Sequence, residues 1–156
     1  MDLAAHFGIT HYATPAGGCL LTNTHTVARI KWLFDNFTET SVNDMLLATV
    51  GRHFALAHNT LLVVGRSEQE NVQLSQMSQR GDVQLELAGQ TGPLSILRGP
   101  STPEICKTAA AITVRYSRFR EEKQVRVTIR TQGTSGDEEL VVDPIADHLL
   151  EGSRIV

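Results

Sequence analysis

The chain has 156 residues, of which 41% are hydrophobic, so it is long enough for one sizeable core and too short for two ordinary domains. Its formal net charge is −3, which excludes a nucleic-acid binder that is basic over its whole surface, so any basic surface must be local. Because no apolar run approaches the roughly 18 residues of a membrane span and no secretory signal is apparent, we expect a cytoplasmic protein without a membrane partner.

The first part of the chain has helical patterns. Residues 22–24 offer N-cap side chains for a helix whose predicted apolar face consists of Val27, Ile30, Phe34 and Phe37. A second, shorter helix is predicted to start after Ser41 and to stop before Gly51. We therefore interpret residues 1–50 as a helical lead-in that contains the segment PAGGCLLT, and residues 51–156 as an α+β domain.

Strand patterns follow. Residues 61–64 form an unbroken apolar run that ends at Gly65, which is typical of a central strand buried on both faces. The preceding RHFAL predicts a strand joined to it by a tight turn at His58 and Asn59. After a polar segment that contains Val72, Leu74 and Met77, residues 82–88 alternate as a strand, and Ile96 in LSIL is expected to point inward from a periodic segment of its own.

The C-terminal half adds a helix and a half-buried strand. Pro103 in the first turn and the capping-box spacing of Ser101 and Glu104 predict a helix that covers the sheet through Ile105, Ala109, Ile112 and Tyr116. Residues 124–130 alternate as a strand, QGTSGDEE predicts a hairpin loop, and LVV predicts a short strand. The predicted fold is α+β, with a mostly antiparallel sheet, a covering helix and one core shared by Val63, Leu85, Ile96, Ala109, Ile112 and Val127.

Several motifs occur in a fixed order: VGRSEQENVQL, GDVQLEL, a Gly-Pro ahead of LSIL, EICKTAAAITVRYS and QVRVTI. Over residues 60–129 this order resembles the NFACT-R domain, the RNA-binding portion of the NFACT proteins. The resemblance implies RNA as a partner and assigns Arg66 and Asn71 to the site. Ser67 departs from the usual Asn, and Gln84 and Glu86 replace a usual aromatic residue and a usual His. The resemblance then implies that this copy lacks a phosphate donor.

Cys19 is the candidate for chemistry. The two glycines before it allow close backbone approach, and a helix N-terminus shortly after it favours a thiolate; the alternative is a buried small hydrophobe. Cys106 lies within an alanine-rich helix, where packing is the expected role. Both thiols are expected to be reduced, because they lie far apart in a chain without secretory features. The histidines near Cys19 lack metal-ligand spacing, so no metal is expected.

PAGGCLLT, with the helix after it, resembles the cysteine segment of PP-loop tRNA thiouridine synthases. The resemblance implies the C-terminal piece of a tRNA thiolation-like protein, in which Cys19 handles sulfur and a PP-loop ATP-binding domain acts in cis or in trans. The chain itself contains no PP-loop or Walker-type loop, so it is not predicted to be an autonomous synthase and no cofactor is expected.

A second candidate site is a basic segment that surrounds Tyr116 and Phe119. It could grip phosphates and stack a base, and it contains Arg115, Arg118, Arg120, Lys123, Arg126 and Arg130. The alternative is a solvated helix end, because Glu121 and Glu122 dilute the positive field. We expect weak RNA binding, with Arg118, Arg120 and Lys123 as the phosphate contacts.

These observations support an accessory RNA-binding or substrate-positioning module of a tRNA thiolation-like protein. The alternative from another class is a protein-interaction or oligomerisation module in which Cys19 is structural, and self-association stays open. A third reading is a small thiol enzyme. RNA binding, alkylation of the thiols and the oligomeric state distinguish these functions.

Overall fold

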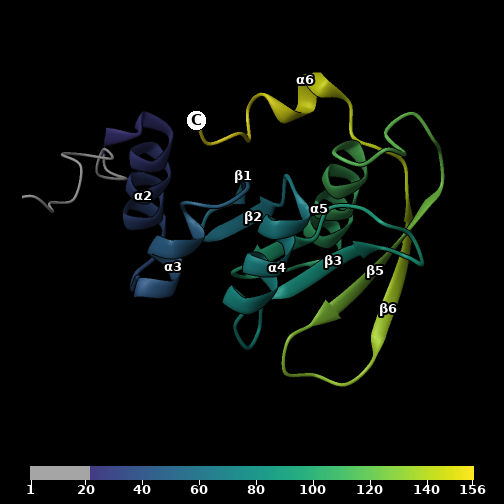
Figure 1. Cartoon of the computed structure of the whole chain (residues 1–156), viewed down its shortest axis with the longest axis horizontal. Coiled ribbons are helices and arrows are strands. Elements are labelled where there is room, and N and C mark those ends of the chain that lie inside the picture. The colour runs from purple at the N-terminus through teal and green to yellow at the C-terminus, as the bar shows by residue number, and fades with distance from the viewer. Residues whose placement is uncertain (1–21) are drawn as a thin grey trace, which may run out of the picture.

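The computed structural model describes residues 22–156, and these form one antiparallel sheet with helices against both faces (Figure 1). The sheet is six-stranded in the order β1-β2-β4-β3-β5-β6. Its strands are β1 Arg52–Ala57, β2 Thr60–Val64, β3 Val83–Leu87, β4 Ser95–Arg98, β5 Val125–Thr131 and β6 Asp137–Val142. The helices are α2 Thr24–Asn36, α3 Val42–Leu47, α4 Glu68–Met77, α5 Pro103–Arg115 and α6 Asp147–Leu150. The predicted α+β fold is confirmed, whereas Cys19 and most of PAGGCLLT lie outside the described residues.

Strand β2 is buried along its whole length and pairs antiparallel with β1 and β4. This confirms an interior strand, although the middle of the sheet lies between β4 and β3. The turn before it is confirmed as well, because Asn59 has a φ of 59°, in the left-handed region that Asn tolerates better than most residues.

The sheet separates two apolar clusters. On one face α5 packs through Ala109 and Ile112 against Leu85 and Val127. On the other face Val63 and Ile96 pack with residues from α2, α3 and α4. The prediction of a single core is therefore wrong, although all six residues are buried. A strand buried on both faces sends successive side chains to opposite clusters, so Val63 cannot share a core with Leu62.

Helix α2 presents a different face from the predicted one. Its N-cap is Asn23, which accepts hydrogen bonds from the amides of His25 and Thr26 at 3.0 and 3.2 Å. Its contacts with the core form the stripe Thr26, Ile30, Leu33 and Phe37, while Val27 and Phe34 are 43% and 62% exposed. The helix carries apolar residues on two adjacent stripes, and packing against the sheet decides which one is buried.

Element boundaries follow local capping. Ser41 and Asp44 form the capping box that starts α3. Helix α5 begins at Pro103, as predicted, but Thr102 rather than Ser101 accepts the hydrogen bond from the amide of Ile105, at 3.3 Å. Strand β6 begins at Asp137, so the acidic residues predicted to lie in the hairpin loop belong to the strand.

A buried ion cluster ties the helical layer to the sheet. The guanidinium of Arg98, at the end of β4, lies 2.7 Å from a carboxylate oxygen of Asp44 and 2.7 Å from one of Asp82. It also donates a hydrogen bond to the carbonyl of Met77 at 3.0 Å. The start of α3, the end of α4 and the start of β3 are thus held together by one cation.

The C-terminal segment returns to the sheet after α6 and runs beside β1 (Figure 1). The amide of Ala55 donates to the carbonyl of Ser153 at 2.7 Å, and the amide of Ile155 donates to the carbonyl of His53 at 3.0 Å. This contact brings Arg154 to the β1 edge of the sheet. Within residues 22–156, no helix is long and apolar enough to cross a membrane.

Candidate nucleic-acid interface

A cleft of about 370 Å³ opens where β2 ends and α4 begins. It is enclosed by the start of β1, the β2–α4 turn, the loop before β4 and the end of α5. Its lining residues are Arg52, Gly65, Arg66, Ser67, Glu68, Asn71, Thr91, Gly92, Pro93 and Tyr116. The cleft therefore gathers segments that are distant in the sequence around Arg66 and Asn71, both of which the sequence predicted as site residues.

Asn71 fixes the shape of the cleft. Its Nδ2 donates to the carbonyl of Gly92 at 3.1 Å, and its Oδ1 accepts from the amide of Leu94 at 3.0 Å. Gly65 allows this arrangement, because a Cβ at that position would collide with the Oδ1 of Asn71. Both polar atoms of the Asn71 amide are thus used within the protein, and its role at the site is to position the loop before β4.

Arg66 is held by Glu70, one helical turn further along. The Nε of Arg66 donates to Glu70 Oε1 at 2.9 Å, and the backbone amide of Arg66 donates to Glu70 Oε2 at 2.8 Å. The hydrogen bond from Arg66 lowers the pKa of the Glu70 carboxyl, and the same bond raises the pKa of Arg66. The Arg66 side chain is nevertheless 47% exposed, so the guanidinium is oriented and still open to solvent.

Arg52, at the start of β1, lines the same cleft as Arg66, and the sequence analysis missed it. Its guanidinium carbon lies 4.7 Å from the centre of the Tyr116 ring, a cation–π contact that holds the side chain in place. Burial lowers the pKa of Arg52, the charges of Arg66 and Arg154 act in the same direction, and Tyr116 and Glu70 oppose them. The register of the β1–β2 hairpin could have located this residue, because Arg52 pairs with Val64, two residues before Arg66.

Further positive charge comes from Arg29 and Arg154. Arg29, on α2, donates to the carbonyl of Ala48 at 3.2 Å, and its pKa is lowered by burial and by the charges of Arg66 and Arg154. Within residues 22–156, neither of these arginines nor Arg52 forms an ion pair with a carboxylate. The chain thus has a local excess of positive charge despite its net charge of −3. We call Arg29, Arg52, Arg66 and Arg154 the arginine cluster.

The start of α4 faces the same cleft. Ser67 is the N-cap and accepts a hydrogen bond from the amide of Glu70 at 3.2 Å. The first helical hydrogen bond runs from the amide of Asn71 to the carbonyl of Ser67, so the amides of Glu68 and Gln69 have no partner within the helix. Amides of this kind bind anions, and an arginine beside them strengthens the attraction. The negative charges of Glu68 and Glu70 reduce the positive potential at this helix start, but they are fewer than the four charges of the arginine cluster.

The positive charge of the basic segment predicted around Tyr116 is largely balanced by acids in the structure. Most of its arginines face acids: Arg115 pairs with Asp147 at 2.6 Å, Arg120 with Glu121 at 3.5 Å, Arg126 with Glu139 at 3.7 Å and Arg130 with Asp137 at 2.7 Å. Arg118 donates to Gln90 at 2.9 Å and lies over Phe119, and Lys123 is exposed. RNA contact by these residues stays a prediction.

The other predicted positions lie elsewhere. Gln84 and Glu86 are on β3, where they pair with Arg130 and Thr128 of β5, and neither lines the cleft. Cys19, the predicted sulfur-handling residue, is outside the described residues. Cys106 is partly buried, and burial raises the pKa of its thiol. In the part of the chain that the structure describes, no group of three His, Cys, Asp or Glu side chains is arranged to hold a metal ion.

Comparisons with known proteins identify the family and the fold. The chain is similar to the C-terminal part of the fibronectin/fibrinogen-binding protein from Streptococcus suis, with a TM-score of 0.59, 16% identity, and coverage of 84% of this chain and 69% of that chain. At this identity the likeness establishes a shared fold. Comparison with curated proteins found no match. A sequence profile described as "NFACT protein RNA binding domain" matches residues 51–152, a range that includes Arg52, Arg66 and Asn71. The chain therefore belongs to the NFACT protein RNA binding domain family, and its general function is that of an RNA-binding module.

Proposed function

We propose that the chain binds RNA phosphates in the cleft at the start of α4, chiefly through Arg52 and Arg66. The observation that carries this proposal is the arginine cluster at the start of α4: within residues 22–156 only Arg66 of the four is ion-paired with a carboxylate, and the amides of Glu68 and Gln69 have no partner within the helix. A phosphate in the cleft would meet cations from β1 and from the β2–α4 turn together with backbone donors. Arginine forks and helix N-termini both bind phosphate oxygens directly.

Contacts within the protein hold the side chains of Arg52 and Arg66 in place before RNA binds. Tyr116 holds Arg52, and Glu70 holds Arg66, so little side-chain freedom is lost when each guanidinium takes up a phosphate. Arg29 and Arg154 are within range to add long-range attraction. If about three phosphates are neutralised, log affinity should fall with log salt with a slope of roughly −2 to −3.

A fluorescence titration with labelled tRNA at several salt concentrations tests the cleft. Replacing Arg52 and Arg66 together by Gln should flatten the slope by about 1.4 to 1.8, because two phosphate contacts are lost. Gln at position 66 retains an amide that can donate to Glu70, which limits disturbance of the turn. The matched control is Arg118→Ala with Arg120→Ala, which removes the same charge from the basic segment.

The two double variants separate the alternatives. Under the proposal, the dependence of log affinity on log salt becomes shallower in the Arg52→Gln, Arg66→Gln variant. It is unchanged in the Arg118→Ala, Arg120→Ala control. If only the control flattens the slope, phosphates bind the basic segment. If the wild-type protein shows no salt-dependent binding at low ionic strength, the proposal for the cleft is refuted. Circular dichroism must show that both variants keep the wild-type fold.

The tRNA thiolation context is a finer proposal. Its support is the resemblance of PAGGCLLT to the cysteine segment of thiouridine synthases, which lies outside the residues that the family profile matches. In this reading the chain positions tRNA for a PP-loop ATP-binding domain supplied in cis or in trans, and Cys19 handles sulfur. Binding that discriminates tRNA from other RNA of equal length would support it, and equal binding would count against it.

A second candidate function is protein interaction or self-association. The observation that favours it is exposed apolar surface on α2 and α3, where Phe34, Val42 and Leu46 are 62%, 77% and 52% exposed. Single exposed apolar residues are common, but Val42 and Leu46 are neighbours at helical spacing. Sedimentation velocity over a range of concentrations tests it, since a dimer weakened by Phe34→Ser or Leu46→Ser would identify the interface.

A further inference from the structure

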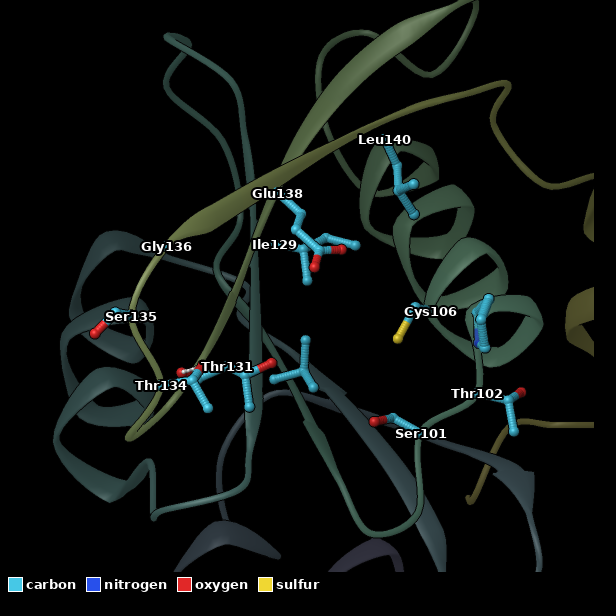
Figure 2. A pocket seen from close by; sticks show the side chains of 12 residues that line it. Ser101, Thr102, Cys106, Ile129, Thr131, Thr134, Ser135, Gly136, Glu138 and Leu140 are labelled. Atoms are coloured by element: carbon cyan, nitrogen blue, oxygen red, sulfur yellow. Dashed lines mark hydrogen bonds between the residues drawn. The ribbon is translucent and has the colours of Figure 1, made fainter.

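A second cavity, of about 510 Å³, lies between the first turn of α5 and the β5–β6 hairpin (Figure 2). Its apolar wall is formed by Val83, Ile129 and Leu140, and Cys106 faces it from α5. Hydroxyl groups complete the lining, from Ser101, Thr102, Thr131, Thr134 and Ser135. The cavity is within the range of about 300 to 1,000 Å³ that is usual for small-ligand sites.

One carboxylate distinguishes this cavity. Strand β6 carries three successive acids, and alternation directs the outer two, Asp137 and Glu139, to the opposite face, where they pair with Arg130 and Arg126. Glu138 is exposed to solvent, lines the cavity and extends toward Cys106 (Figure 2). Within residues 22–156 it has no ion-pair partner, and neither Lys nor Arg lines the cavity.

The lining selects a class of ligand. No cation from residues 22–156 lines the cavity, and the carboxylate of Glu138 would repel a phosphate. An RNA segment that enters the cavity must therefore place a base there instead of a phosphate. A carboxylate such as that of Glu138 has two acceptor oxygens, which suit two parallel N–H donors. Guanine offers this pair through N1–H and the N2 amino group, whereas adenine, cytosine and uracil place an acceptor beside each donor on the same edge. The apolar wall can contact the base, and the hydroxyl of Thr131 can donate to its O6.

We propose that this cavity binds an unstacked guanine base, with Glu138 accepting hydrogen bonds from N1–H and the N2 amino group. Sequence-specific RNA recognition commonly reads bases that are splayed out of a single strand. Helix α5 begins at this cavity, and its C-cap residue Tyr116 lines the cleft at the start of α4. Its 13 residues span about 20 Å, a distance that a few nucleotides can cross. The proposal rests on the RNA-binding function, but its test does not require phosphate binding in the cleft.

The test uses GMP, AMP, CMP and UMP as probes, because all carry the same phosphate and differ in the base. Methyl-labelled protein is titrated with each, and NMR shifts of the Val83, Ile129 and Leu140 methyl groups report occupancy of the cavity. GMP should shift these signals at concentrations at least tenfold lower than the other nucleotides do. Glu138→Gln should abolish that preference, because an amide presents a donor to one of the two guanine N–H groups.

Glu139→Gln is the matched control, since it makes the same change on the opposite face of β6. It should retain the preference for GMP. Equal shifts with all four nucleotides, no shift at these methyl groups, or a preference that survives Glu138→Gln would overturn the proposal. Shifts caused by a simple diamine such as putrescine, without any caused by GMP, would also overturn it and identify an ammonium site. Loss of tRNA binding in the cleft variant leaves the GMP result unchanged, so failure of either proposal can be distinguished.

Discussion

His53 should make the stability of the protein fall as the solution becomes mildly acidic. The imidazole is only 1% exposed, and its Nε2 lies 3.1 Å from the carbonyl oxygen of Leu47, to which the neutral ring donates. Its Nδ1 is buried without a hydrogen-bond partner. Burial, followed by the charge of Arg29, lowers the pKa of His53 to about 3. The folded protein therefore keeps this ring neutral in conditions where the unfolded chain protonates it.

The sign and size follow from proton linkage. The unfolded state binds the extra proton below a pKa of 6.5, and the folded state does so only near 3. The free energy of unfolding should thus decrease as pH falls through this window, by about 1.4 kcal/mol for each pH unit once protonation of the unfolded chain is complete. Between pH 7 and pH 5 the loss is about 2 kcal/mol. Carboxylates with a lowered pKa, such as Asp44, add their own loss at more acidic pH.

Urea denaturation at pH 7, 6 and 5 measures this loss. His53→Gln keeps a side-chain donor for the Leu47 carbonyl and removes the titrating ring, so it should remove most of the decrease between pH 7 and 5. His58→Gln is the control, because it replaces an exposed histidine and leaves His53 in place. Equal unfolding free energies of the wild-type protein at pH 7 and 5, or a His53→Gln variant with the wild-type slope, would refute the reasoning.

Two further predictions concern stability and thiol reactivity. Arg98→Met should lower the free energy of unfolding by about 3 to 5 kcal/mol in urea denaturation, because it leaves two buried aspartates without their cation; recovery of stability on also replacing both aspartates by Asn would confirm the cause. Cys106 should react slowly with iodoacetamide at neutral pH, because burial raises the pKa of its thiol. Mass mapping should find Cys19 alkylated first, and equal labelling would contradict a reactive Cys19.

Local patterns predicted the sheet well because each strand carries its own periodicity. The alternation of Val83, Leu85 and Leu87, and the face of α5 that includes Ala109 and Ile112, can be read without knowing what they pack against. The face of α2 could not be read in this way. Two adjacent apolar stripes were available, and the position of the sheet decided between them. The single predicted core failed for a different reason: the apolar run of residues 61–64 indicated a strand buried on both faces, but the prediction still assigned Val63 to the same core as Leu85.

The site was predicted in part. Arg66 and Asn71 lie in one motif and line the same cleft, so the family resemblance located them. The other members of the arginine cluster come from α2, β1 and the C-terminal segment, and only the folded chain brings them together. Conversely, the segment with the highest local density of basic residues lost its apparent charge, because acids from β6 and α6 lie beside Arg115, Arg126 and Arg130.

The pairing of the C-terminal segment with β1 affects both the solubility of the protein and its attraction for an anionic ligand. An uncovered outer strand exposes unpaired backbone groups that can recruit a strand from another molecule, which is a route to aggregation. The residues that cover β1 include Arg154, whose charge reaches the cleft. Deletion of residues 153–156 would therefore expose the unpaired backbone groups of β1, and it would also reduce the positive charge near the cleft. The Arg154→Gln variant separates the two effects, because it removes the charge and keeps the backbone that covers β1. Any precipitation of the truncated protein with RNA should therefore be compared with the behaviour of this variant.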